Sequence, residues 1–166
     1  RDPVGDPVLQ ARLADLGGRL AERFVRAVRS GRRARPDLWF TYHLYYKAPD
    51  WIGPAVADAL GIPYAIAEAS VAHKRAGGPW DLGHRATLQA LGRADLVVGL
   101  NSRDRVLVAP AMGAQARHLH LRPFLDLSGI HPRDSRQPGP PRLLAVGMMR
   151  EGDKASSYLK LAEALA

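Results

Sequence analysis

"PDLWFTYHLYYKAPDWIGPAVADALGIPYAIAEAS", residues 36–70, alternates two kinds of segment. Apolar runs at 37–43 and 63–69 flank an alanine-rich run at 53–61, which begins Gly-Pro and ends in glycine. Proline suits the first turn of a helix and glycine suits its C-terminal end. A strand, a helix and a second strand at this spacing predict parallel strands joined by a right-handed crossover.

The same unit repeats along the chain. Further strands are predicted at 95–101, 117–122 and 142–147, and further helices at 81–94 and 102–113. Ser102 is the expected N-terminal cap of its helix. Upstream, a helix is predicted at 7–31, ending at Gly31, because apolar residues recur there at steps of three or four. Its predicted core-facing stripe is Leu9, Leu13, Leu16, Leu20, Phe24 and Val28. The alternation predicts an α/β protein with a doubly wound, Rossmann-like parallel sheet.

The stretch from 122 to 142 interrupts this rhythm with five prolines and two glycines. It separates a predicted first domain (1–131) from the first β-α unit of a second domain (142–166), with a Pro-rich linker at 132–141. No strand precedes the first helix, so we expect the first strand or strands of the first domain to be missing. The sequence is thus expected to be truncated at both ends.

Composition excludes several classes of protein. The 166 residues contain no cysteine, which excludes disulfide scaffolds, cysteine nucleophiles and thiolate metal sites. No run approaches the roughly 18 apolar residues of a membrane span, and no signal-peptide layout is present, so a cytoplasmic location is expected. The net charge of +8 suits anionic partners, but the scattered arginines fit a solvated surface at least as well.

Polar and aromatic side chains follow the first two predicted strands, where parallel sheets bind ligands. They are Tyr42, His43, Tyr45, Tyr46 and Lys47 after the first strand, and Glu68 and Lys74 after the second. The group after the first strand is typical of a sugar or polyol site, with a packed aromatic corner as the alternative. Glu68 suits either a general base or a structural ion pair with Lys74 or Arg75.

Two histidines of a later strand, His118 and His120, fall on one face. Two imidazoles at this spacing can share a metal ion, but no third ligand is evident nearby, so no metal is predicted.

The last stretch, "RLLAVGMMREGDKASSYLKLAEALA" (142–166), combines an apolar strand, Gly147, two cations and a helix start. Arg150 and Lys154 beside free helix amides suit a diphosphate. The alternative is a solvated turn in which Glu151 and Asp153 offset the positive charge.

With these segments in order, most of residues 36–166 resemble bacterial glycosyltransferases of the GT-B fold, family 4 type. The likeness is carried by residues 36–70, "RADLVVGLNSRD", "LRPFLDLSGIHP" and residues 142–165. It implies a two-domain, retaining, metal-independent enzyme with no cofactor besides its donor, a nucleotide-diphosphate sugar. The first domain would hold the acceptor. Lys154 and Gly147 match the family's lysine and turn glycine, whereas Met148 stands where the family has arginine and Arg150 is the nearest substitute.

The expected function is therefore glycosyl transfer by the full-length protein to an unknown acceptor, with these 166 residues inactive alone. Expected catalytic residues are His43, Glu68 and Lys74, and expected donor-binding residues are Gly147, Arg150 and Lys154. No nucleic-acid partner is expected, and the oligomeric state is not predicted. Peripheral contact of the first helix with the inner membrane stays open. The alternative function, which Met148 favours, is a non-catalytic α/β module that binds a sugar or phosphorylated ligand.

Overall fold

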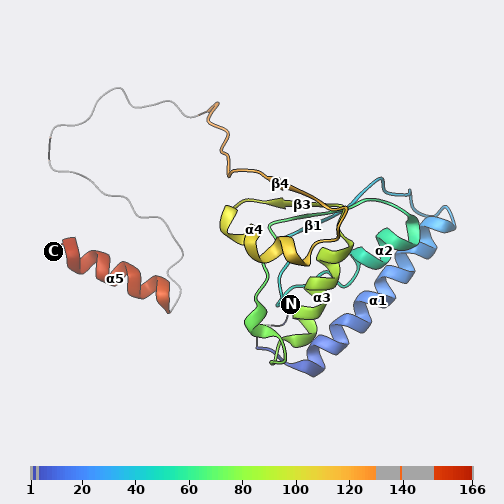
Figure 1. Cartoon of the computed structure of the whole chain (residues 1–166), viewed down its shortest axis with the longest axis horizontal. Helices are drawn as coiled ribbons and strands as arrows, with labels where there is room; N and C mark the ends of the chain where they lie inside the picture. Colours follow the sequence, from blue (N-terminus) through green and yellow to red (C-terminus); the bar gives the residue numbers. More distant parts are fainter. Residues whose placement is uncertain (1, 3, 130–138, 140–151, 166) are drawn as a thin grey trace. The chain divides into compact units, whose positions relative to one another are not determined.

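The computed structural model describes residues 2, 4–129, 139 and 152–165 (Figure 1). The chain divides into two compact units, Arg1–Leu125 and Asp126–Ala166. In the second unit, the described residues form one helix, α5 (Asp153–Leu165). Gly147, Arg150 and the predicted strand at 142–147 lie outside the described residues, as does the predicted linker apart from residue 139. The predicted domain boundary and linker therefore stay predictions.

The first unit has the predicted alternation of strands and helices. Its elements are α1 (Pro7–Arg29), β1 (Trp39–Tyr42), α2 (Gly53–Leu60), β2 (Tyr64–Ala67), α3 (Asp81–Arg93), β3 (Leu96–Gly99), α4 (Ser102–Val108) and β4 (Arg117–His120), with short 3-10 turns at η1 (His73–Arg75) and η2 (Ala109–Ala111). The predicted cap of α4 is wrong by one residue. The side chain of Asn101 accepts the backbone N–H of Arg103 at 2.8 Å, and Ser102 is the first helical residue.

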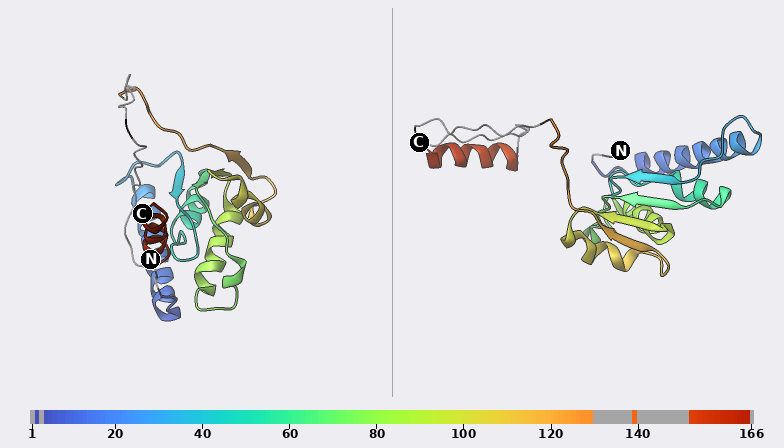
Figure 2. Two further views of the ribbon diagram at one scale, coloured as in Figure 1. Left: turned by 90° about the vertical axis from the view of Figure 1, so that its left-hand side faces the viewer. Right: turned by 90° about the horizontal axis from the view of Figure 1, so that it is seen from above.

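The four strands are all parallel and lie in the order β1-β2-β3-β4. Each strand pairs with its neighbour in sequence, so right-handed crossovers place α2, α3 and α4 on one face of the sheet. Helix α1 packs on α2 and α3. Figure 1 shows these four helices below the sheet, and the right-hand view of Figure 2 looks onto the opposite face. The prediction of an α/β parallel sheet is confirmed.

The two faces of the sheet differ in burial. The helix-covered face carries the buried side chains of Tyr64, Ile66 and Val97. The opposite face leaves Phe40 57% and Tyr42 65% exposed. A doubly wound sheet has helices on both faces. Within the first unit, the described residues supply helices on one face only, so the doubly wound arrangement is not confirmed.

Helix α1 forms where predicted and ends at Arg29, two residues before the left-handed Gly31, which has a φ of 71°. The predicted core stripe is only partly right, since Phe24 packs against a buried cluster but other members do not. Leu16 and Leu20, expected in the core, are exposed. The buried side of the helix is the adjacent stripe, Gln10, Gly17, Ala21 and Val25. A Cβ at position 17 would overlap the Cβ of Trp51, so glycine there permits the close approach. No helix within the described residues combines the length and apolar character of a membrane span.

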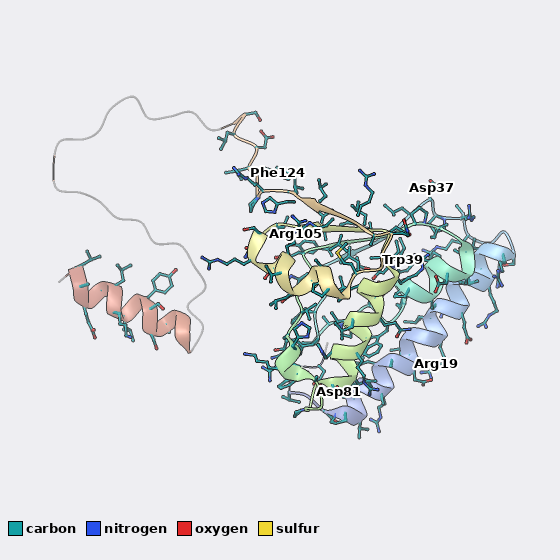
Figure 3. The ribbon with its side chains drawn as sticks, viewed as in Figure 1. Arg19, Asp37, Trp39, Asp81, Arg105 and Phe124 are labelled. Atoms are coloured by element: carbon teal, nitrogen blue, oxygen red, sulfur yellow. The ribbon has the colours of Figure 1, made fainter. Side chains whose placement is uncertain are left out.

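One carboxylate, Asp50, joins three elements of the first β-α-β unit. Its Oδ1 accepts the backbone N–H groups of Ile52 (2.9 Å) and Gly53 (2.7 Å) at the start of α2. Its Oδ2 accepts three side-chain donors from the strands: Trp39 Nε1 (3.1 Å), the Tyr64 hydroxyl (3.0 Å) and the Thr41 hydroxyl. Figure 3 labels Trp39, the β1 member of this group.

The same carboxylate helps to raise the pKa of Tyr64. Burial is the largest cause that raises the pKa of this phenol far above 10.0, and the negative charge of Asp50 adds to it. Tyr64 is therefore a neutral hydrogen-bond donor to Asp50 at any physiological pH.

Replacement Asp50→Ala is expected to lower the free energy of unfolding by about 3 kcal/mol or more, because several partly buried donors lose their acceptor together. Denaturant titration followed by circular dichroism measures this. Asp37→Ala, at an exposed aspartate labelled in Figure 3, is the matched control and should change stability by less than about 0.5 kcal/mol. A loss below about 1 kcal/mol for Asp50→Ala would contradict the role given to this group.

Candidate functional site

The structure brings His43 and Glu68 together at the carboxyl edge of the sheet. Each residue directly follows its strand, and the register pairs Tyr42 with Ala67 immediately before them. Their backbone N–H groups extend the ladder, from His43 to the carbonyl of Ala67 (2.8 Å) and from Glu68 to that of Val98 (2.9 Å). Nδ1 of His43 lies 3.2 Å from Oε2 of Glu68, with the two side chains 54% and 36% exposed.

Both residues have left-handed backbone conformations. His43 has a φ of 64° and Glu68 a φ of 58°, and no other non-glycine residue in the described part of the chain has a positive φ. A side chain in this region costs roughly 1 kcal/mol relative to the ordinary regions. Glycine would remove that cost, so the presence of His43 and Glu68 here indicates a use for their side chains. Strain of this kind clusters at functional sites.

Tyr42 completes the pair from the last position of β1. Its hydroxyl donates a hydrogen bond to Glu68, which raises the pKa of Tyr42 because the neighbouring carboxylate disfavours a phenolate. The same bond is the largest cause that lowers the pKa of Glu68, against an opposing effect of burial; the nearby His43 lowers it further. Oε2 of Glu68 is shielded from solvent, and Nδ1 of His43 approaches it at ion-pair distance without hydrogen-bond geometry.

Of the two alternatives for Glu68, the ion pair with Lys74 or Arg75 does not form among the described residues. Glu68 pairs with His43 instead, because the parallel register places the ends of β1 and β2 side by side. Lys74 lies exposed in η1 and forms no ion pair among the residues that the structure describes. Of the three expected catalytic residues, the structure therefore assembles two.

An aromatic row extends from the pair along this edge. Edge-to-face contacts run from His43 to Tyr45 (ring centroids 4.9 Å apart), from Tyr45 to Tyr46 (5.7 Å) and from Tyr46 to Trp80 (5.7 Å). The tyrosines thus form the packed aromatic corner that the sequence left as one alternative. This packing does not exclude the other alternative, a sugar or polyol site, because such a site also uses aromatic faces.

Two cations lie on the far end of this row. The guanidinium of Arg75 lies 4.6 Å from the centroid of Trp80 and 5.1 Å from that of Tyr46, and Nζ of Lys47 lies 5.0 Å from Trp80. Nε of Arg75 and Nε1 of Trp80 are buried without hydrogen-bond partners. Buried donors normally have a partner, so these atoms mark a place for a ligand group or water. Sequence reasoning did not single out Trp80, although the Gly-Gly-Pro turn before it was a signal.

The remaining candidates from the sequence lie elsewhere. Lys154 is the second residue of α5, and its expected companions Gly147 and Arg150 are outside the described residues. His118 and His120 lie in β4, and burial is the largest cause that lowers the pKa of His118. Within the described ranges, no three or more histidine, aspartate or glutamate side chains gather around a point that a metal ion would fit.

Comparison with known proteins finds no relative of this chain. No family model, no curated protein and no solved structure matches the chain. The interpretation of the edge site therefore depends on its own geometry.

Tyr42→Phe is expected to raise the pKa of Glu68 toward its ordinary value of 4.5, because the donor that stabilises the carboxylate is removed. Carbon-13 NMR titration of the Glu68 carboxyl group measures this shift. Since the folded pKa is lowered, the bond stabilises the protein at neutral pH, and this stabilisation disappears as the pH falls through the pKa of Glu68.

Tyr45→Phe is the matched control, because the pKa of Glu68 is affected by the hydroxyl of Tyr42 and not by that of Tyr45. It should leave the pKa of Glu68 unchanged. Titration of Glu68 at or above 4.5 in the unmodified chain would contradict the hydrogen bond.

Proposed function

We propose that this chain is the acceptor-binding part, with the start of the donor-binding part, of a glycosyltransferase that uses a nucleotide-diphosphate sugar. The observation that carries the proposal is the His43–Glu68 pair, held on left-handed backbone at the ends of β1 and β2. Ligands of open parallel sheets bind beyond the carboxyl ends of the strands. A half-exposed imidazole backed by a carboxylate at that edge suits a ligand with hydroxyl groups.

The proposed role of His43 follows from which of its ring nitrogens faces Glu68. Nδ1 faces Glu68, so in the neutral ring we assign the proton to Nδ1 and leave Nε2 as an acceptor. A hydroxyl group of the acceptor donates a hydrogen bond to Nε2. During transfer, its oxygen bonds to the anomeric carbon on the same face that the diphosphate leaves, while the bond from that carbon to the diphosphate breaks, so the configuration is retained. The hydroxyl proton passes to Nε2, and the negative charge of Glu68 stabilises the resulting imidazolium.

The aromatic row supports a carbohydrate acceptor. The row of Tyr45, Tyr46 and Trp80 starts beside His43. Aromatic side chains with a few polar atoms commonly line pockets for such ligands. The unpartnered Nε of Arg75 and Nε1 of Trp80 then have hydroxyl or phosphate oxygens of the acceptor as their partners.

On the donor side, Lys154, Gly147 and Arg150 are proposed to bind the diphosphate. Fixed cations facing the charge that develops on a leaving group lower the barrier to its departure. The family resemblance is the support for retention of configuration and for a mechanism without a metal ion. The proposal also includes a doubly wound acceptor domain, and it assigns the activity to the full-length protein.

The test is sugar transfer by the full-length protein from a panel of nucleotide sugars. His43→Ala is expected to lower kcat for transfer by about 10²-fold or more while hydrolysis of the donor continues, because its proposed role is at the acceptor. Lys154→Ala is expected to lower both activities. His120→Ala, at an exposed histidine that ends β4, is the matched control and should retain both.

Failure to consume any nucleotide sugar would contradict the proposal, and sugar binding without turnover would favour a non-catalytic module. Undiminished transfer by His43→Ala would remove the role given to the pair.

A further inference from the structure

A basic groove with an apolar floor lies beside the C-terminal half of α1. It has a volume of about 440 Å³, within the range of small-molecule sites. Its floor includes Phe24, Trp39 and Ile52, and its rim carries Arg23, Arg32 and Arg33. No aspartate or glutamate lines it.

Neighbouring arginines outside the groove are engaged with the protein. Arg26 pairs with Glu22 at 3.4 Å. Arg29 donates to the carbonyl of Ala59 at 2.8 Å, and Arg35 donates to that of Leu60 at 2.7 Å. These side chains therefore have a structural use that does not require a ligand.

The three groove arginines differ from these neighbours. Among the described residues, Arg23, Arg32 and Arg33 have no carboxylate or carbonyl partner for their guanidinium groups. Arg32 donates from Nε to the Ser30 hydroxyl at 3.0 Å, which leaves its terminal nitrogens available. The guanidinium of Arg33 lies 4.7 Å from the ring centroid of Phe24. Three guanidinium groups without counter-charge around one apolar floor are suited to an anion.

The turn that carries two of these arginines is held in place by backbone bonds. Gly31 donates to the carbonyl of Val28 at 3.0 Å, and the N–H of Arg33 donates to that of Ala27 at 3.1 Å. The left-handed φ of Gly31, 71°, lets the chain fold back onto α1. The side chains of Arg32 and Arg33 thus start from a fixed position beside Phe24, which lowers the entropy lost when they close on a ligand.

We propose that this groove binds a phosphate ester whose apolar or aromatic part lies on Phe24 and Trp39. The phosphate oxygens accept hydrogen bonds from the terminal nitrogens of Arg32 and Arg33, and Arg23 supplies the third positive charge. The edge-to-face pair of Phe24 and Trp39, with centroids 5.5 Å apart, presents the apolar surface. Trp39 begins β1, at the end opposite His43, so the groove is separate from the edge site and does not depend on the function proposed for it.

Isothermal titration of the complete chain with phenyl phosphate, inorganic phosphate and phenol tests the proposal. Phenyl phosphate is expected to bind about tenfold more tightly than inorganic phosphate, because its ring covers apolar surface, and phenol is expected not to bind measurably. The indole N–H resonance of Trp39, assigned with Trp39→Phe, should shift in the same titration. Arg32→Gln/Arg33→Gln is expected to weaken phenyl phosphate binding at least tenfold.

Arg12→Gln/Arg122→Gln is the matched control, since it removes two exposed arginines away from the groove with the same change in net charge. It should bind phenyl phosphate like the unmodified chain. Absence of saturable binding to the unmodified chain, or an equal loss in the control, would overturn the proposal.

Vesicle sedimentation distinguishes the two sources of the phosphate. If phosphatidylglycerol vesicles retain the unmodified chain but not Arg32→Gln/Arg33→Gln, while phosphatidylcholine vesicles retain neither, the ligand is a lipid headgroup. If phenyl phosphate binds and neither kind of vesicle does, the ligand is a soluble phosphate ester. Equal retention of the unmodified chain and Arg32→Gln/Arg33→Gln on anionic vesicles would show general charge attraction and would exclude the lipid source.

Discussion

The hydrogen bonds to Asp50 are the constraint on which the first β-α-β unit depends. A single carboxylate accepts donors from β1, from β2 and from the start of α2, and so fixes the strand pair relative to the helix that connects it. The segment between His43 and Asp50 is thereby anchored at both ends. Within it lie Tyr45 and Tyr46, so the anchoring at Asp50 also limits where these two rings of the aromatic row can lie.

The candidate site shows the opposite arrangement, in which the local backbone is disfavoured and the side chains are half exposed. Left-handed conformations at His43 and Glu68 cost stability, and an ion pair at this exposure returns little of it, typically less than about 1 kcal/mol. The backbone hydrogen bonds of the sheet hold both residues in these conformations, since both continue its ladder. Two side chains from different strands are therefore presented together at the edge where parallel sheets bind ligands.

The sequence predicted the elements of the first unit well, because short apolar runs and a periodic first helix are local signals. It could not choose the buried stripe of α1, since that choice depends on Gly17 meeting Trp51 from a distant part of the chain. For Glu68 it offered, as one alternative, an ion pair with the cations that follow in sequence, whereas the strand register places His43 beside Glu68. It also overlooked Asp50, although an aspartate whose side chain can accept the backbone N–H groups two and three residues further on is a familiar turn signal.

The central claim is that His43 and Glu68 are retained for function at a cost to stability. The most direct measurement is the free energy of unfolding of the chain with His43→Gly/Glu68→Gly, compared with the unmodified chain. Glycine has no penalty at the φ values of 64° and 58°, so the account predicts equal or greater stability, by up to about 2 kcal/mol. A loss of more than about 1 kcal/mol would contradict it, because the pair would then be part of what holds the sheet together.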